Sequence, residues 1–251
     1  MAERRHPPAY GDGEDGALRL GVAAGKIGNG HAATGGKGDG FLSLSSGDDV
    51  AVDDRAPGGR PITGRPSRAA AEAAVRTLIA WLGEDPDREG LRDTPKRVVR
   101  SYDELFAGYV MDPRRLLETT FEDVGSYDEL VVLRDIRVVS FCEHHMLPVV
   151  GRAHVGYLPD RRLVGLSKLA RVVDGFGKRL QIQERLVAEI AETIEAVLKP
   201  RGVGVVIEAE HSCMTLRGIN RPGAVMTASC LLGAIRDDAR TRSEFLQLVR
   251  G

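Results

Sequence analysis

Residues 129–159 read "ELVVLRDIRVVSFCEHHMLPVVGRAHVGYLP" and contain two runs rich in β-branched residues, separated by a short polar segment. Such runs favour β-strands because branched side chains pack well on a pleated surface. We therefore predict one strand over residues 129–141 and a neighbouring strand over residues 148–159. The connection between them places one cysteine, one glutamate and two histidines at consecutive positions 142–145.

Helical and strand patterns follow one another downstream of these two strands. Residues 167–180 and 183–199 carry apolar side chains at helical spacing, and the second segment ends before Pro200 and Gly202. The next two segments, 203–213 and 224–235, are apolar and β-prone, and residues 241–249 predict a short closing helix. This order predicts an α+β domain at residues 129–251, with an antiparallel four-stranded sheet and two helices packed on one face.

The part of the chain before residue 129 divides into a helical segment and a tail. At residues 67–128 we predict two helices, the first capped by Ser67 and the second, about four turns long, capped by Thr94 with Pro95 in its first turn. Residues 1–66 are rich in glycine and poor in aromatic residues, a composition that predicts a disordered tail.

Bulk properties exclude several classes of protein. The formal net charge of −1 gives no reason to expect nucleic acid as a partner. Three cysteines, at positions 142, 213 and 230, are too few and too irregular for a disulfide framework, so we expect reduced thiols. Nowhere do 18 apolar residues run together, so no membrane association is predicted. We therefore expect a cytoplasmic protein.

Cysteine and histidine side chains suggest a metal site formed by two distant segments. Cys142 and His145 stand three apart at the end of a predicted strand, and His211 and Cys213 stand two apart on another, where they would share a face. Two thiolates and one imidazole around Zn²⁺ would leave the fourth tetrahedral position for water, as in catalytic zinc sites. The remaining histidines would then be available as bases.

Two other interpretations of the same residues stay open at this point. Cys142 and Cys213 can be ordinary buried thiols, with the histidines bonded to backbone carbonyls. Alternatively, His144 or His211 can complete a closed, four-ligand structural zinc site. Cys230 lies in an apolar segment without a nearby histidine, so we assign it to the core.

Basic residues between the two clusters predict an anion site. In "GLSKLAR", residues 165–171, Ser167 can cap a helix on which Lys168 and Arg171 share a face. A helix N-terminus attracts phosphate through its free N–H groups and its dipole, and Arg217 is a further candidate cation. A solvated basic face is the competing interpretation.

The segment "QIQERL", residues 181–186, offers a base-recognition site. Gln183 and Glu184 fall in the first turn of a predicted helix, where the dipole keeps a carboxylate ionised. An ionised carboxylate only accepts hydrogen bonds, so it matches two adjacent donors such as the N1–H and 2-amino groups of guanine. A glutamate that only complements the helix dipole is the competing interpretation.

Five motifs occur in one order along the chain: "CEHH" at 142–145, "GLSKLAR" at 165–171, "QIQER" at 181–185, "HSCM" at 211–214 followed by "RG", and "TRSEFL" at 241–246. In this order the chain resembles the zinc-dependent GTP cyclohydrolase I family. The resemblance covers residues from Ser67 to the C-terminus and includes "REGLRDTPKRV" at 88–98, but not the glycine-rich tail.

The resemblance implies a role for each singled-out residue. Zinc would be held by Cys142, His145 and Cys213, with His144 and His211 as acid/base residues and Ser167 assisting proton transfer. Guanine would be held by Gln183 and Glu184. The ribose and triphosphate would be lined by Ser167, Lys168, Arg171 and Arg217, and by Arg97 reaching the site of a neighbouring subunit.

The family reaction opens the imidazole ring of GTP with water, releases formate and rearranges the product to 7,8-dihydroneopterin triphosphate, the first step of tetrahydrofolate and pterin biosynthesis. The resemblance also implies the tunnelling fold and a homo-oligomer, a decamer of two pentameric rings with sites between subunits. Three histidine ligands, or a metal-free cysteine nucleophile, would instead indicate other enzymes of this fold. A zinc-stabilised, non-catalytic GTP-binding scaffold is the alternative from another functional class.

Overall fold

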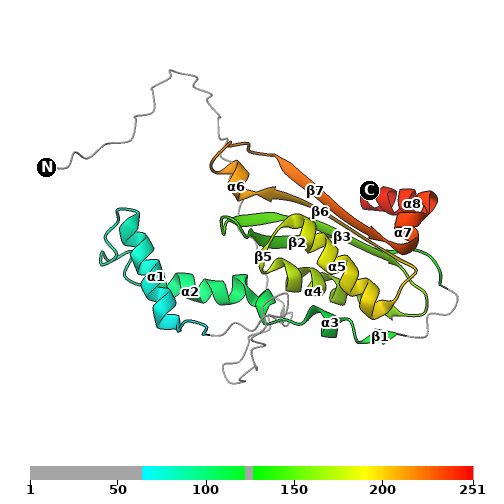
Figure 1. The fold of residues 1–251 in the computed structure, drawn as a ribbon, viewed down its shortest axis with the longest axis horizontal. Helices are drawn as coiled ribbons and strands as arrows, with labels where there is room; N and C mark the ends of the chain where they lie inside the picture. The colour runs from blue at the N-terminus through cyan, green and yellow to red at the C-terminus, as the bar shows by residue number, and fades with distance from the viewer. Residues whose placement is uncertain (1–63, 122–126, 251) are drawn as a thin grey trace, which may run out of the picture. The chain divides into compact units, whose positions relative to one another are not determined.

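A computed structural model describes residues 64–121 and 127–250 (Figure 1). It confirms the α+β class. Four long strands pair antiparallel in the order β2 (Val131–Cys142), β3 (Pro148–Leu158), β6 (Gly202–His211) and β7 (Val225–Leu232). A fifth strand, β5 (Leu180–Gln181), pairs parallel with the end of β2, so the predicted count of four was wrong. A strand of two residues carries no periodicity that the sequence could have shown.

The two predicted helices on one face of the sheet are confirmed. Helix α4 (Leu166–Gly177) packs on β2, and α5 (Gln183–Leu198) packs on β6 and β7. Alternate residues of β6, including Val203, Val205 and Ile207, point into the core beneath these helices. The alternation follows from the period of two along a strand, which places every second side chain on the same face. The N-cap of α4 is Gly165, so the prediction that Ser167 caps this helix was wrong.

A smaller apolar cluster lies on the opposite face of the sheet. Strand β7 leads into α7 (Gly233–Asp237) and then α8 (Ala239–Arg250), the closing helix that the sequence predicts. Phe245 of α8 and Ile235 are fully buried there, and they pack with the buried Val206. Its ring lies directly over Gly156 and Gly204, where an added Cβ would come within 2.6 to 2.7 Å of ring atoms. The lack of a side chain at these two glycines therefore leaves room for the Phe245 ring of the C-terminal helix.

We expect Gly204→Ala to destabilise the protein by about 1–3 kcal/mol, because a methyl group there would clash with the Phe245 ring. Urea unfolding of the purified variant measures the loss. Gly165→Ala is the matched control, since nothing lies within 4 Å of a Cβ built at Gly165. Equal stability of the two variants would contradict the proposed packing role.

The N-terminal helices are present with corrected bounds. Helix α1 (Arg68–Trp81) is capped as predicted, with the Ala70 N–H donating to Ser67 Oγ at 3.2 Å. Helix α2 (Thr94–Leu105) has Asp93 at its N-cap in place of Thr94, and it ends before the predicted fourth turn because a 3-10 turn, η1 (Ala107–Tyr109), follows it.

Polar contacts join the turn η1 to the sheet domain. Arg179 is buried, and its guanidinium donates from Nε to the Gly108 carbonyl at 2.9 Å. The Leu180 N–H donates to the Tyr109 hydroxyl at 3.1 Å. Short elements complete the described chain: α3 (Pro113–Leu116), α6 (Ser212–Thr215), and the two-stranded sheet of β1 (Thr120–Phe121) and β4 (Leu163–Val164).

The predicted tail, residues 1–66, lies outside the described residues except for its last three. The predicted boundary between residues 128 and 129 stays a prediction. Within residues 64–121 and 127–250, no helix is both long and apolar enough to cross a membrane.

Candidate metal centre and its surroundings

Three potential metal ligands converge at one end of the sheet. Cys142 ends β2, and a tight turn follows in which the His145 and Met146 N–H groups both donate to the Cys142 carbonyl. Cys213 follows β6. Strands β2 and β6 flank β3 on either side, with Phe141 opposite Pro148 and His211 opposite Val149. This register brings Cys142, His145 and Cys213 together, with their ligand atoms all within 4.8 Å of one another.

The geometry and chemistry of these three donors fit zinc. Zn–S bonds of about 2.3 Å and Zn–N bonds of about 2.1 Å at tetrahedral angles put sulfur and nitrogen about 3.6 Å apart. Cys142 Sγ and His145 Nδ1 are 3.6 Å apart. Soft thiolate sulfur combined with imidazole nitrogen favours zinc over the hard cations Mg²⁺ and Ca²⁺.

The burial and proximity of Cys142 and Cys213 disfavour ionisation of both thiols without a metal. Burial raises the pKa of the Cys213 thiol, and the neighbouring Cys142 raises it further. Two negative sulfurs this close repel one another unless a cation lies between them. All three cysteines are free thiols, as predicted, and Cys230 packs against the main core, as predicted.

The sequence placed Cys213 on a strand beside His211, and this was wrong. Strand β6 ends at His211, and Cys213 lies in the short helix α6 that follows. The helical turn carries the thiol toward Cys142 instead of along the sheet. Among the described residues, the only group of three or more donors with the spacing of a metal site is Cys142, His145 and Cys213, called the triad below. It includes neither His144 nor His211.

His211 lies beside the triad in a partly buried position. Burial lowers the pKa of its imidazole, and the opposite charge of Glu184 partly offsets this effect. Its Nε2 shares a hydrogen bond of 2.8 Å with Gln183 Oε1. A lowered pKa keeps the ring neutral at neutral pH, the form that can accept a proton. His144 lies in the exposed turn after β2, with its Nδ1 at 3.8 Å from Cys142 Sγ.

The two residues predicted to bind guanine differ in exposure. Glu184 is exposed in the first turn of α5, and its charge acts on His211. Gln183 is 4% exposed, and both its amide hydrogens are directed at carbonyl groups, of Ile207 at 2.8 Å and Met226 at 2.9 Å. The Glu184 carboxylate therefore faces solvent and its charge reaches His211, whereas the Gln183 amide is held within the protein.

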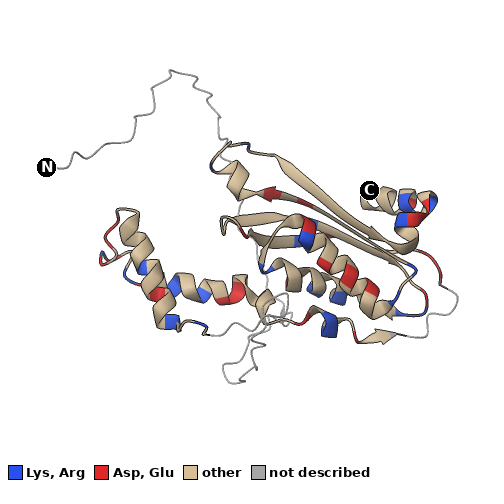
Figure 2. Cartoon of the chain, in the orientation of Figure 1, with Lys and Arg blue, Asp and Glu red and all other residues tan. Residues whose placement is uncertain are grey.

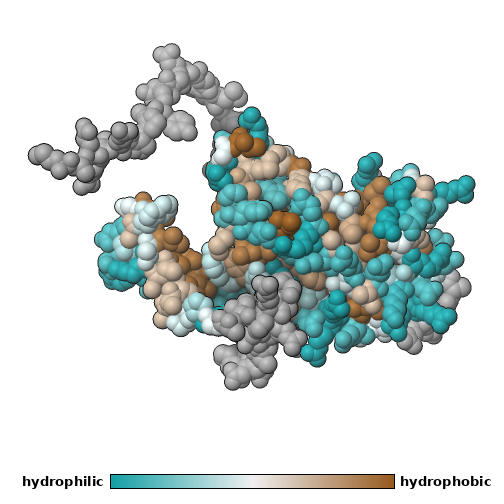
Figure 3. Space-filling view, in the orientation of Figure 1, coloured by the Kyte–Doolittle hydropathy of each residue, from teal (hydrophilic) through white to brown (hydrophobic). Residues whose placement is uncertain are grey.

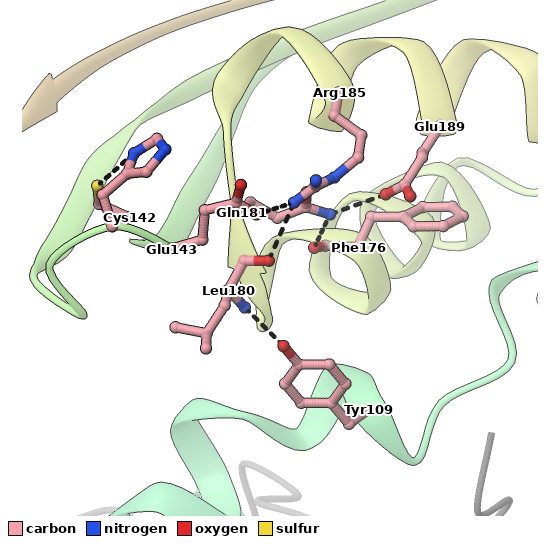
Figure 4. Close-up of polar contacts among 9 residues, drawn as sticks. Tyr109, Cys142, Glu143, Phe176, Leu180, Gln181, Arg185 and Glu189 are labelled. Atoms are coloured by element: carbon pink, nitrogen blue, oxygen red, sulfur yellow. Dashed lines mark hydrogen bonds and ion pairs between the residues drawn. The ribbon is translucent and has the colours of Figure 1, made fainter. Parts of the chain in front are cut away.

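A polar network that we did not predict fixes the start of α5 (Figure 4). Arg185 pairs with the Glu143 carboxylate and donates from Nε to Gln181 Oε1 at 2.9 Å. Gln181 Nε2 donates in turn to Glu189 at 2.8 Å. Gln181, Arg185 and Glu189 recur every four residues, which is the one sequence signal that could have revealed this network. It ties the turn carrying the metal ligands to α5.

The predicted phosphate-binding residues of α4 are not brought to the triad. Val164, just before α4, donates from its N–H to the Tyr157 hydroxyl, and Tyr157 is paired with Val131 at the start of β2. The triad lies at the other end of β2, roughly 35 Å away for a strand of this length. Ser167 and Lys168 follow Val164 directly, so they lie at the far end of the sheet, with Arg171 one turn further along α4.

The other two predicted phosphate-binding cations, Arg217 and Arg97, differ in their surroundings. Arg217 lies close enough to the triad for its charge to act on Cys213. Arg97 makes local contacts, donating to the Gly90 carbonyl and to Thr94 Oγ1 on the helical segment. Figure 2 shows the distribution of charge on α4, which carries the predicted phosphate ligands, and on α5, which carries several exposed acidic residues.

Comparison with known proteins identifies the family. The chain is 54% identical to the GTP cyclohydrolase 1 of Brucella anthropi over 187 residues, 74% of this chain and 88% of that protein. It is also 54% identical to the GTP cyclohydrolase 1 of Brucella abortus (strain S19) over 186 residues, 74% of this chain and 87% of that protein.

Among solved structures, a crystal structure of the archaeosine synthase QueF-Like in the apo form is similar with a TM-score of 0.37 and 19% identity, over 43% of this chain and 97% of that one. The model of the family described as GTP cyclohydrolase I matches residues 71–250, which include the triad, His211 and both ends of the sheet. The chain belongs to the GTP cyclohydrolase I family.

Proposed function

We propose that this protein hydrolyses the imidazole ring of GTP, releases formate and forms 7,8-dihydroneopterin triphosphate at a zinc site held by Cys142, His145 and Cys213. The observation that carries the proposal is the convergence of these three donors within 4.8 Å in a chain of this family. Zinc bound there would act as a Lewis acid that activates water for hydrolysis. The product would enter tetrahydrofolate and pterin biosynthesis.

The protein's own residues would handle protons and hold the base. His211, neutral because burial lowers its pKa, can accept a proton and return it at the ring nitrogen that becomes an amine. His144, on the exposed turn beside Cys142, is the second candidate for this exchange. Glu184 can accept hydrogen bonds from guanine N1–H and the 2-amino group, because an ionised carboxylate offers only acceptors.

The direct test is purified protein supplied with GTP and zinc. We expect equimolar formate and a fluorescent pterin after oxidation of the product. GTP bound without any release of formate would instead support the non-catalytic scaffold.

We expect Glu184→Gln to weaken GTP binding by about 10–100-fold, because a hydrogen bond to a charged group is worth about 1.5–3 kcal/mol and the amide presents one acceptor where guanine needs two. Isothermal titration of the zinc-loaded variant with GTP and ATP measures this change. The control is Glu192→Gln, an exposed glutamate further along α5. Equal affinity of the unmodified protein for GTP and ATP would remove the guanine assignment.

We propose further that the protein assembles as a homo-oligomer of the tunnelling-fold type, a decamer of two pentameric rings. A single chain separates its phosphate-binding candidates on α4 from the triad by the length of the sheet, so a complete site needs α4 of a second copy. Exposed apolar side chains on the helical segment also favour association: Leu78, Trp81 and Leu82 are 57%, 79% and 72% exposed. Figure 3 shows hydrophobic surface on this segment.

Mixed oligomers test whether two copies share one site. We expect Lys168→Ala and Cys213→Ala to be inactive alone and to regain part of the activity when they are unfolded and refolded together, because some sites then combine an intact triad with an intact α4. Native mass spectrometry counts the subunits. A mixture that stays inactive although hybrid oligomers form would show that each site is built from one chain.

A further inference from the structure

We infer that Gln183 is a positioning residue that holds His211 in one tautomer, with the proton on Nε2 and the lone pair on Nδ1. The inference rests on the proposed function for its catalytic meaning, but its geometry does not depend on the reaction. This positioning role takes the place of the predicted role of the Gln183 side chain as a direct guanine ligand.

The orientation of the Gln183 amide is fixed by its surroundings. Its Nε2 lies 2.8 Å from the Ile207 carbonyl oxygen on β6 and 2.9 Å from the Met226 carbonyl oxygen near the start of β7. An amide nitrogen has two hydrogens, and here each has an acceptor. A flipped amide would put its oxygen against two carbonyl oxygens and leave no donor between them, a costly arrangement for a side chain that is 4% exposed.

The fixed amide determines which nitrogen of His211 carries the proton. Gln183 Oε1 lies 2.8 Å from His211 Nε2, and a carbonyl oxygen can only accept a hydrogen bond. Nε2 must therefore be a donor, so in the neutral ring Nδ1 is the basic nitrogen. The tautomer of a histidine is set by the partner of its other nitrogen, and here that partner is held by two strands.

The surroundings of the hydrogen bond between Gln183 and His211 strengthen it. His211 and Gln183 line the same small cavity, together with Ser140, Val149 and Leu186. In such a partly buried place a hydrogen bond is stronger than in water, and competition from solvent is reduced. Loss of the Gln183 carbonyl oxygen would free the ring to take either tautomer and either orientation, so a fraction of molecules would present N–H where a base is needed.

Gln181 provides a matched control for a purely structural role. It is also buried, at 5% exposed, lines the same cavity, and donates from its amide to the Phe176 carbonyl and to Glu189. It makes no hydrogen bond to His211. Replacement of either glutamine by methionine removes a buried amide of nearly the same shape, but only Gln183→Met removes the acceptor that faces the imidazole.

The tautomer is tested by nitrogen-15 solid-state NMR on the full-length, zinc-loaded protein with labelled histidine rings at mildly alkaline pH. We expect a pyrrole-type signal for His211 Nε2 and a pyridine-type signal for Nδ1, assigned by their loss in His211→Gln. The Gln181→Met spectrum should be the same, and Gln183→Met should show both tautomers. A pyridine-type Nε2 in the unmodified protein overturns the inference, even if Gln183→Met does not fold.

Kinetics then test the positioning role. We expect Gln183→Met to lower kcat by about 10–100-fold with little change in the KM for GTP, the usual effect of losing a partner that orients a site residue. Ser140→Ala removes a buried hydroxyl that lines the same cavity and makes no hydrogen bond to the described residues, so it should retain most of kcat. Equal losses in the two variants would show a structural role only and overturn the inference. Absence of turnover in the unmodified protein would refute the proposed function but leave the NMR result valid.

Discussion

Replacement of Cys213 by alanine is expected to remove zinc from the protein and to lower turnover of GTP by at least about 10³-fold. Two ligands, Cys142 and His145, remain, and a two-ligand site binds zinc weakly. The metal is worth several kcal/mol of transition-state stabilisation, which corresponds to a rate loss of this order. Metal content by inductively coupled plasma mass spectrometry, together with a formate assay, measures both effects.

The third cysteine provides the control for this experiment. Cys230 lies on β7, packs against the main core and is outside the triad. Cys230→Ala should keep its zinc and its activity, with a small loss of stability from a shortened side chain. If Cys213→Ala purified with a full complement of zinc, the assignment of the metal ligands would be wrong.

Replacement of His211 by alanine is expected to separate metal binding from catalysis. His211 is outside the triad, so zinc and GTP should still bind, whereas the loss of an acid/base group lowers the rate by about 10²–10⁴-fold. Single-turnover measurement of formate release, with zinc content measured on the same sample, shows whether the loss lies in chemistry. The non-catalytic scaffold predicts no formate release from the unmodified protein, so it is tested in the same series.

A second buried histidine serves as the comparison. His154 on β3 is 5% exposed, and its Nδ1 accepts a hydrogen bond from the Asp135 N–H. His154→Asn preserves an acceptor in this position and should leave formate release near normal. Unchanged turnover in His211→Ala would refute the acid/base role of His211.

The contrast between Glu184 and Gln183 shows the limit of reasoning from the sequence. Both fall in the first turn of one helix and were predicted to share a function, and the position of the turn is correct. Successive residues on a helix point about 100° apart, so one side chain faces solvent and the other faces the sheet. Which of them faces the sheet depends on how α5 packs, and only the tertiary structure shows this.

The sequence by itself determined the local elements and the residue types of the metal site. The strands before and after the "CEHH" segment, the two helices on the sheet and the capping of α1 by Ser67 follow from periodicity and side-chain chemistry, which act over a few residues. The choice of two sulfurs and one nitrogen for zinc also needs no coordinates, since it follows from the softness of the donors.

Only the tertiary structure decided which distant groups meet. The pairing of β2 and β6 on either side of β3 brings Cys142 within reach of Cys213, and it leaves Lys168 at the far end of the sheet. The two-residue strand β5 and the bond from Gln183 to His211 have the same origin. Strand register and helix packing are set by the burial of the whole core, so contacts between residues far apart in the chain leave no local pattern in the sequence.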